Sequence, residues 1–394
     1  MAAVTDERGS ARVSYWNDPK VRAIVVQIVV VVLVGWFAWE IIQNTIDNLR
    51  SRNIASGFGF LSITSGFDII QTLVDYSNTS SYGRALIVGL LNTLVMAILG
   101  IIAATIIGFV IGIMRLSGNW MIRKIATVYI EVVRNIPLLL QIFVWYALVL
   151  KPLPGPKQAI GFLESVFLSN RGLVMPKPMF SPAAWLAVIA LAAGIGGAIY
   201  LKQWAAKRQE ATGEQFPVLW TSIGLIIGLP LLALAVTGFP VTFEFPALAG
   251  FNFSGGMTII PEFIALFLAL SIYTASFIAE IVRAGILAVS HGQTEASGAL
   301  GLRRGPTLRL VVIPQALRVI IPPLTSQYLN LTKNSTLAVA IGYPDLVATG
   351  GTVLNQTGQA IEIISIWMMI YLSLSLLTSS LMNWYNARVR LVER

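Results

Sequence analysis

The sequence contains no cysteine, and this absence excludes several classes of site. Without thiols the chain can form no disulfide, no iron–sulfur cluster and no thiolate metal centre. It also has a single histidine, His291, which leaves too few ring nitrogens to build a zinc centre. We therefore expect no metal site in this chain, and the lack of an HExxH-type motif argues against a membrane metalloenzyme.

Charged residues are also scarce. They make up 11% of the 394 residues, whereas soluble domains carry about 25%. Hydrophobic residues reach 56%, and apolar windows of about 20 residues recur along the chain. The sequence thus predicts an all-α polytopic membrane protein surrounded by lipid. Its net charge of +9 is better explained by basic loops retained in the cytoplasm than by a nucleic-acid partner, which we do not expect.

Eight segments have the length and composition of membrane spans. We place them at 23–43, 85–114, 125–150, 183–201, 218–238, 258–282, 319–342 and 361–386. In the seventh, Pro322, Pro323 and Lys333 interrupt the apolar pattern, and we expect a break in the helix there. A helix in lipid must satisfy its own backbone hydrogen bonds, so this break requires shelter from neighbouring helices.

The distribution of basic residues predicts how these spans are oriented. The two terminal tails and the loops 115–124, 202–217 and 283–318 together hold 18 Lys and Arg, and the other loops hold seven. Basic loops are preferentially retained in the cytoplasm. We therefore expect both termini and the loop 283–318 to be cytoplasmic.

The predicted spans and loops divide the chain into six segments. They are a cytoplasmic tail (1–22), a first span with its outer loop (23–84), a first part of the core (85–150), outer loops with two spans (151–257), a second part of the core (258–386) and a cytoplasmic tail (387–394). In the outer loop 151–182, repeated prolines favour an extended and stiffened backbone.

The cytoplasmic stretch 290–315 is too polar for lipid but has the pattern of a short helix. Ser290 and Gln293 have the spacing of a capping box, and Gly301 suits a helix end because glycine accepts the left-handed conformation. The spacing predicts one apolar face, formed by Ala296, Ala299 and Leu300. Such a helix can dock in a groove of another protein, although the pattern also fits a solvated connector between two spans.

Two pairs of opposite charges occur at i, i+3 spacing near the predicted cytoplasmic ends of spans. Glu131 with Arg134, and Glu280 with Arg283, lie close enough along a helix to pair. Ionisable residues in spans usually face one another or a cavity. We interpret both pairs as structural or gating elements rather than as substrate ligands.

The seventh span carries a denser set of polar residues. Gln327, Asn330 and Asn334 share one helix face, and Lys333 and Ser335 flank Asn334. Amides and an ammonium group could bind the charged ends of a zwitterionic solute, which predicts a substrate path. The same residues could instead hydrogen-bond between helices, and the pattern leaves both interpretations open.

The stretch "TEASGALGLRRGPTLRLVVIPQALRVIIPPL" resembles the EAA loop of bacterial ABC-importer permeases. The acid and small residues of that motif match Glu295, Ala296 and Ser297, with serine in place of a second alanine. Its glycine matches Gly301, and its apolar–proline pair matches Ile313-Pro314. The segments "LLNTLVMAILG", "YIEVVRNIPLLLQIFVWY", "YTASFIAEIVRAGI" and "LTKNSTLAVAIGYPDL" resemble polar amino-acid uptake permeases. Nearly the whole chain is similar to permease subunits of bacterial general L-amino-acid importers.

This resemblance implies a fold, a function and a set of partners. The fold would be the five-helix core of a type I ABC-importer permease with three extra spans. The function would be ATP-driven import of L-amino acids across the inner membrane. The chain has no GxxxxGK[ST] phosphate loop, so it would be no enzyme, and ATP and Mg would bind on a partner ATPase dimer.

The same resemblance assigns roles to individual residues and adds two further partners. Glu295 to Gly301 would dock on the ATPase, with Arg303 and Arg304 offering further ion pairs and Pro314 belonging to the motif. A periplasmic amino-acid-binding protein would deliver the substrate, and a second, different permease chain would complete a heterodimer. The alternative is a secondary transporter driven by an ion gradient, which would leave this loop without a purpose.

Overall fold

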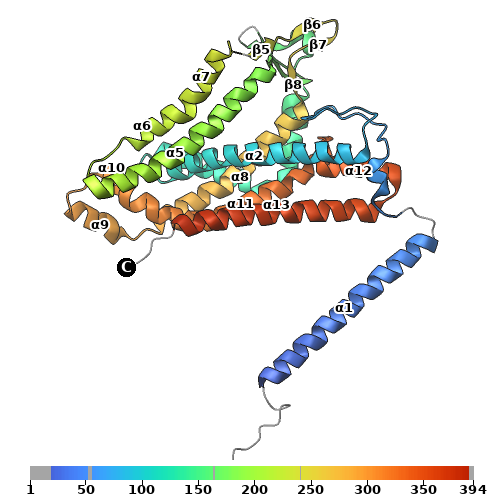
Figure 1. The fold of residues 1–394 in the computed structure, drawn as a ribbon, viewed down its shortest axis with the longest axis horizontal. Coiled ribbons are helices and arrows are strands. Elements are labelled where there is room, and N and C mark those ends of the chain that lie inside the picture. Colours follow the sequence, from blue (N-terminus) through green and yellow to red (C-terminus); the bar gives the residue numbers. More distant parts are fainter. Residues whose placement is uncertain (1–18, 52–55, 163–164, 240, 390–394) are drawn as a thin grey trace, which may run out of the picture.

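The computed structural model describes residues 19–51, 56–162, 165–239 and 241–389. It is mostly helical, at 74%, which confirms the predicted fold class. Seven helices in these described ranges are long and apolar enough to cross a membrane, or eight if one bent pair counts as a single span. Figure 1 shows most of them lying side by side in an elongated bundle.

A central helix, α8 (Pro261–Leu287), organises the bundle. More than half of its most apolar window is buried, a larger share than in any other candidate span that the structure describes. Packed around it are α2 (Tyr82–Arg115), α3 (Trp120–Asn135) and α11 (Ile313–Asn334), and α13 (Ala360–Val389) packs against α11. Side chains of α8 such as Leu266, Leu270 and Ile278 are fully buried in the main apolar cluster.

The helices α2 and α8 approach closely because glycines line their contact. A Cβ added at Gly108 would lie 2.6 Å from the Cβ of Ile278, and one added at Gly112 would lie 2.7 Å from the carbonyl oxygen of Ala279. Small residues that let backbones approach are typical of helix contacts in membranes, where packing replaces the hydrophobic effect as the driving force.

Gly108→Ala should therefore destabilise the protein. The added methyl group would be forced against the buried Ile278, and overpacking of this kind costs about 1–3 kcal/mol. Gly35→Ala is the matched control, because a Cβ at Gly35 in α1 (Pro19–Ser51) meets nothing within 4 Å. The thermal unfolding midpoint in detergent should fall for the first variant only, and equal midpoints would contradict the packing argument.

The predicted third span, 125–150, is not a straight helix. It is divided into α3 and a second piece made of α4 (Leu138–Phe143) and the π-helical turn Val144–Leu150, and the two pieces meet at 104°. The cause is Pro137, which disfavours helical geometry at Ile136 before it, where ψ is 124°. The predicted span thus corresponds to a bent pair of helices, and the sequence analysis did not foresee the bend.

The expected break at Pro322 and Pro323 is wrong. The helix runs without interruption from α10 (Arg304–Thr307) through the π-helical turn Leu308–Val312 into α11, which includes both prolines. The neighbouring side chains Ile320, Ile321 and Leu324 are buried in the bundle, so packing holds this segment in helical form. Tertiary contacts thus outweigh the cost of roughly 3 kcal/mol that an interior proline imposes.

Two expected loops turn out to be helical. The helix α5 (Trp185–Thr212) extends past the predicted end of its span into 202–217, and α12 (Leu346–Thr357) occupies most of the predicted loop 343–360. Between α11 and α12 lies a 3-10 turn, Ser335–Ile341, and Asp345 caps the start of α12 by accepting a hydrogen bond from Ala348 N–H at 2.8 Å.

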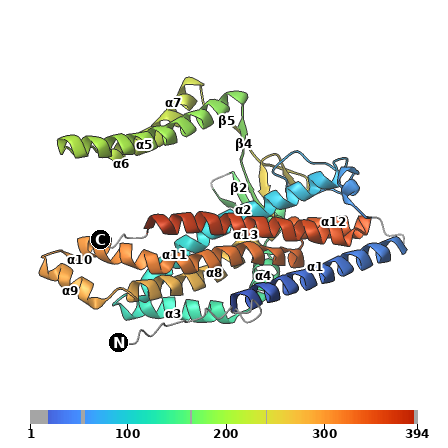
Figure 2. The same cartoon turned by 60° about the horizontal axis from the view of Figure 1, so that its bottom comes forward.

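Two parts of the chain lie apart from the bundle. In Figure 1, α1 stands alone, and its most apolar window has no buried residue within the described chain. In Figure 2, α5 forms a hairpin with the helical segment Val218–Val236 at a distance from the bundle. That segment comprises α6 (Val218–Ile223), the π-helical turn Gly224–Gly228 and α7 (Leu229–Val236).

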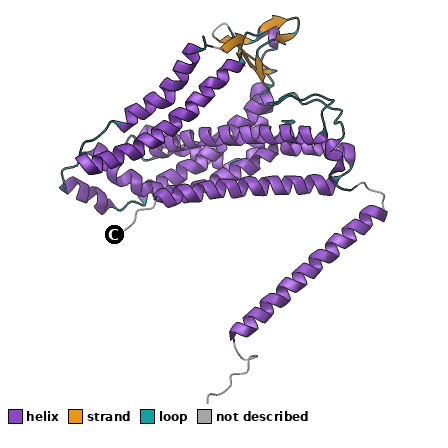
Figure 3. Ribbon diagram, viewed as in Figure 1, coloured by secondary structure: helices purple, strands orange, loops and turns teal. Residues whose placement is uncertain are grey.

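Short strands gather near the start of α8, as Figure 3 shows in orange. One antiparallel sheet has the order β1-β2-β3-β8, from β1 (Ile160–Phe162), β2 (Val166–Ser169), β3 (Gly172–Met175) and β8 (Met257–Ile259). Two antiparallel pairs join β4 (Lys177–Phe180) to β5 (Val241–Glu244) and β6 (Ala247–Ala249) to β7 (Asn252–Ser254). Single-turn 3-10 helices lie at Phe58–Ser62, Pro156–Gln158 and Pro182–Ala184.

Candidate functional site

The candidate docking loop contains the helix α9 (His291–Ala299), at the end of the bundle opposite α12 (Figure 1). Its N-cap is Ser290, as the sequence predicts, but the Ser290 hydroxyl makes no capping bond. Gln293 does not close a capping box either, because its side-chain oxygen accepts a hydrogen bond from the Gln315 amide at 3.2 Å. That bond ties α9 to α11 across 22 residues.

The end of α9 follows the predicted glycine stop. Gly301 has a φ of +73°, in the left-handed region. Leu302 N–H donates to the Ser297 carbonyl at 3.0 Å, and Gly301 N–H donates to the Gly298 carbonyl at 2.9 Å. These two bonds form a Schellman motif, which turns the chain sharply toward α10.

The two faces of α9 differ in burial. Ser297 is buried and its hydroxyl donates to the Gln293 carbonyl at 2.7 Å, so this face packs on the molecule. The predicted apolar face is exposed: Ala296 and Ala299 lie on the surface, and Leu300 is 81% exposed. A short helix with a small-residue face and a leucine left uncovered has the form of a surface for another protein.

The acid of the loop, Glu295, is also accessible. Its side chain is 71% exposed and its carboxylate lies 3.2 Å from Nδ1 of His291, one turn earlier. Sequence reasoning missed this partner, although the i, i+4 spacing was available as a signal. An exposed carboxylate at the edge of an exposed apolar face can form an ion pair with a partner.

The basic and proline residues of the loop lie on the next helical segment. Arg303 is the N-cap of α10, Arg304 is its first residue, and both side chains are exposed. Pro314 lies in the first turn of α11 and is half-buried. The loop thus presents exposed charges of both signs around α9 on a helical support.

The pair of Glu280 and Arg283 is present and larger than predicted. Arg283 donates to Glu280 through Nε at 3.1 Å and through Nη2 at 2.6 Å. Arg115, the last residue of α2, forms an ion pair with the other oxygen of the same carboxylate. One acid therefore joins α2 to α8, and sequence reasoning missed Arg115 because residues 165 apart give no local signal.

The predicted pair of Glu131 and Arg134 is wrong. Both side chains are exposed, and no ion pair joins them among the residues that the structure describes. The Arg134 guanidinium lies 4.8 Å from the centre of the Phe277 ring instead. A cation over an aromatic face is an alternative partner that the spacing along one helix does not reveal.

The polar residues of the seventh span face away from the chain. Asn330 and Lys333 are exposed, Gln327 and Asn334 are half-buried, and none of the four has a side-chain hydrogen bond within the described ranges. Ser335 is buried, and its hydroxyl donates to the Thr332 carbonyl at 2.7 Å. The interhelical bonds expected under the structural interpretation are thus not made inside this part of the chain.

Polar contacts at the α12 end of the bundle were not foreseen. Asn92, fully buried in α2, donates to the carbonyls of Gln71 and Pro344 at 3.0 and 2.9 Å. Asp345 is also fully buried, and one of its carboxylate oxygens has no hydrogen-bond partner. Burial raises the pKa of Asp345 from 3.8 to about 7.

This pKa predicts how stability depends on pH. Because the folded-state pKa lies above the unfolded value, the folded chain binds the extra proton between about pH 4 and pH 7, and stability falls as pH rises through that window. Asp345→Asn keeps an oxygen for Ala348 N–H and carries no charge. This substitution should remove the pH dependence that Asp345 causes. It should also raise the free energy of unfolding above pH 7 by up to about 4 kcal/mol.

The measurement is the thermal unfolding midpoint of the purified protein in detergent from pH 5 to pH 8. Asp75→Asn is the control, because Asp75 is exposed on the preceding loop. A wild-type midpoint that stays constant or rises over this range, with no gain for Asp345→Asn, would show that the buried carboxylate carries no such cost.

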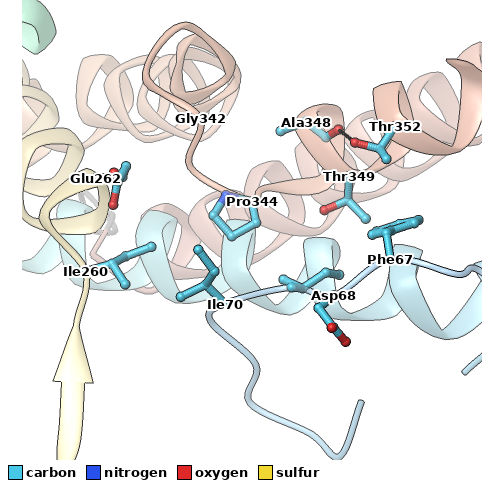
Figure 4. A pocket seen from close by; sticks show the side chains of 11 residues that line it. Phe67, Asp68, Ile70, Ile260, Glu262, Gly342, Pro344, Ala348, Thr349 and Thr352 are labelled. Carbon is cyan, nitrogen blue, oxygen red and sulfur yellow. Dashed lines mark hydrogen bonds between the residues drawn. The ribbon is translucent and has the colours of Figure 1, made fainter. Parts of the chain in front are cut away.

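Beside Asp345 lies a cavity of about 300 Å³, shown in Figure 4. We call it the α12 pocket. Its walls come from the loop 67–70, from the start of α8, from Gly342 and Pro344, and from α12. The lining residues are Phe67, Asp68, Ile69, Ile70, Ile260, Glu262, Gly342, Pro344, Ala348, Thr349 and Thr352.

Comparison with known proteins gives a consistent result. The family model for the binding-protein-dependent transport system inner membrane component matches residues 213–391. The chain is 59% identical to the general L-amino acid transport system permease protein AapQ of Rhizobium johnstonii, covering 96% of this chain and 94% of that protein. It is 54% identical to the putative amino-acid ABC transporter permease protein YhdX of Escherichia coli, covering 96% of each chain. It is 44% identical to the glutamate/glutamine/aspartate/asparagine transport system permease protein BztB of Rhodobacter capsulatus, again covering 96% of each.

Proposed function

The chain belongs to the family of binding-protein-dependent transport system inner membrane components and is a multi-pass inner-membrane permease of an amino-acid ABC transporter, and from this premise we propose that α9 is where a separate ATPase docks. The ATPase, acting as a dimer, would bind ATP and Mg. This chain would supply the path, and α9 would transmit the movement that accompanies ATP binding and hydrolysis.

The exposed face of α9 is the observation that carries this proposal. Ala296 and Ala299 allow close approach, Leu300 offers an apolar anchor and Glu295 offers a charge. The Schellman motif and the bond between Gln293 and Gln315 hold α9 against the helix that continues into the membrane. A displacement of α9 by a partner can therefore be transmitted to α11.

We further propose that the substrates are L-amino acids, including the acidic amino acids and their amides. The names of two relatives describe transport of L-amino acids in general and of glutamate, glutamine, aspartate and asparagine. Residues Gln327, Asn330, Lys333, Asn334 and Ser335 would contribute to the path. Amides and an ammonium group can bind a zwitterion without selecting one side chain.

A second permease chain would cover the polar face of α11. Asn330 and Lys333 lie in a candidate span and are exposed in the single chain. Polar and charged groups facing lipid are costly, so these residues require a water-filled path or another chain beside them. A second, different permease, forming a heterodimer across this face, would provide both.

The orientation and the remaining partner complete the proposal. With its excess of basic residues, the α9 end and both termini would face the cytoplasm. The α12 end would then face the periplasm, where a binding protein would deliver the substrate. The reconstituted transporter distinguishes this function from an ion-gradient carrier, because uptake should require ATP and persist without a proton or sodium gradient.

A cross-linking experiment tests the docking role directly. Because the chain has no cysteine, a single introduced cysteine is its only thiol. Ala296→Cys, on the exposed face, should cross-link to the ATPase with high yield in isolated membranes. Ser297→Cys is the matched control on the next residue, which is buried, and it should react at least about tenfold less. Equal labelling of both, or none to the ATPase, would contradict docking through α9.

A further inference from the structure

The α12 pocket is formed by segments that carry acids and no basic residues. The two segments 56–81 and 342–362 contain Asp68, Asp75, Asp345 and Glu362 and have no lysine or arginine. Glu262, in the first turn of α8, adds a fifth acid. Asp345 and Glu362 are buried, but Asp68 and Asp75 are exposed and Glu262 is half-buried, so this end presents acidic groups although the chain has a net charge of +9. Such a surface attracts a cation rather than an anion.

Inside the pocket, one carboxylate is positioned by a hydrogen bond. Glu262 is half-buried and accepts a hydrogen bond from the Tyr146 hydroxyl at 2.8 Å. No ion pair to Glu262 occurs within the described ranges. Lys151 interacts with the same tyrosine, its ammonium 5.1 Å from the centre of the Tyr146 ring, so a cation lies beside the partner of Glu262, although Lys151 does not line the pocket. The charge of Glu262 is therefore held in place but not neutralised by a direct partner.

The remaining walls are mainly apolar. Figure 4 shows Ile70, Ile260 and Pro344 along the side of the pocket, with Glu262 at one end and the Asp68 carboxylate directed away from them. An apolar pocket with a carboxylate at one end is complementary in shape and charge to a long side chain that has a methylene stem and a cationic head group. Lysine and arginine have this form, since they bury their stems and keep their heads at polar groups.

The absence of basic groups excludes a free amino acid as the best occupant. No lysine, arginine or histidine is among the residues that line the pocket. A zwitterionic substrate would therefore leave its α-carboxylate without a positive partner and beside negative charges. A cationic side chain that belongs to a polypeptide carries no such carboxylate.

The surface beside the pocket also has the character of a protein contact. Ile70 is 88% exposed and Phe58 is 55% exposed, and both belong to a segment outside the candidate spans. This segment lies at the opposite end of the bundle from α9 (Figure 1). Exposed apolar side chains around a charged pocket are typical of an interface in which one anchoring residue is surrounded by apolar contacts.

We propose that the α12 pocket receives a lysine or arginine side chain of the periplasmic binding protein, with the cationic head at Glu262 and the stem against Ile70, Ile260 and Pro344. The inference rests on the proposed function, because it requires a binding protein on this side of the membrane. The pocket orients that protein as it docks and is separate from the polar face of α11.

The experiment uses the complete reconstituted transporter and measures ATPase stimulation as the binding protein is titrated. Glu262→Gln removes the charge and keeps an oxygen for Tyr146. It should raise the concentration of binding protein that gives half-maximal stimulation roughly tenfold and leave the maximal rate unchanged. Ile70→Lys, which places a cation at the exposed wall, should have a similar effect. The difference between Glu262→Gln and the wild type should shrink at 0.5 M salt.

Two controls separate this role from a structural one. Tyr146→Phe removes the hydrogen bond that Glu262→Gln preserves and keeps the Glu262 charge, and Glu244→Gln removes an exposed acid on β5, outside the pocket. Both should leave the half-maximal concentration unchanged. A rise in the half-maximal concentration for Tyr146→Phe as large as that for Glu262→Gln would show that the charge of Glu262 is not what the binding protein recognises, and would overturn the proposal.

Other outcomes are also decisive. If Glu262→Gln changes the apparent KM for the amino acid at saturating binding protein and not the half-maximal concentration, the occupant is the substrate and the proposal fails. If both pocket variants titrate like the wild type, the pocket does not receive the binding protein. If no binding protein stimulates even the wild type, the proposed function itself is wrong.

Discussion

Glu295→Lys should abolish ATP-driven uptake while leaving the protein folded in the membrane. The side chain is 71% exposed on the uncovered edge of α9, so a lysine fits there without disturbing the bundle. Reversing the charge would replace the proposed ion pair with the ATPase by a repulsion at the proposed docking surface. Losing a charge pair at an interface costs about 2–5 kcal/mol, which corresponds to a loss of at least about 30-fold in affinity for the ATPase.

The measurement combines uptake in vesicles with co-purification of the ATPase. Glu210→Lys is the matched control, because it makes the same change at another exposed position near the end of α5. Glu295→Gln should fall between the wild type and the reversal, since it removes the attraction without adding repulsion. Normal uptake and normal co-purification in Glu295→Lys would refute docking through this helix.

Glu280→Gln should destabilise the bundle strongly. The carboxylate joins Arg283 on its own helix to Arg115 on α2, and its side chain is 27% exposed. Removing the negative charge leaves two partly buried guanidinium groups beside each other without an acid. Breaking a buried pair costs 3–5 kcal/mol, and partial exposure lowers the expected loss to about 2–3 kcal/mol.

A triple variant separates this charge imbalance from loss of packing. Replacing Glu280, Arg115 and Arg283 together by methionine removes every charge and keeps much of the side-chain volume. Because exchanging a whole buried ion pair for apolar residues is often neutral, the thermal midpoint should return close to that of the wild type. A triple variant as unstable as Glu280→Gln would show that the specific hydrogen bonds, and not the unpaired arginines, determine stability. Uptake by a stable triple variant then reports whether the cluster also serves in gating.

Much of the fold could be predicted from local patterns. An apolar stretch of about 20 residues has few alternatives to a membrane helix, so the predicted spans match α1, α2, α5, α8 and α13 to within a few residues at most of their ends. The loop at 290–315 was predictable for a similar reason. The stop at Gly301 depends on the backbone freedom of one glycine, and the small residues of α9 are adjacent in the sequence.

Only the tertiary structure could settle the rest, because those features depend on which distant residues meet. Pro137 bends its span whereas Pro322 and Pro323 do not, and the difference lies in the packing around α11. Glu280 forms an ion pair with Arg115, and Arg134 lies over the ring of Phe277 instead of pairing with Glu131.

The α12 pocket combines residues as far apart in the sequence as Phe67 and Thr352, so no local pattern could indicate it. Whether a segment forms a helix in lipid is determined by its own composition, because its backbone groups can form hydrogen bonds there only within the segment itself. A charge or a cavity in the bundle is determined by its neighbours, and those are known only once the helices have packed.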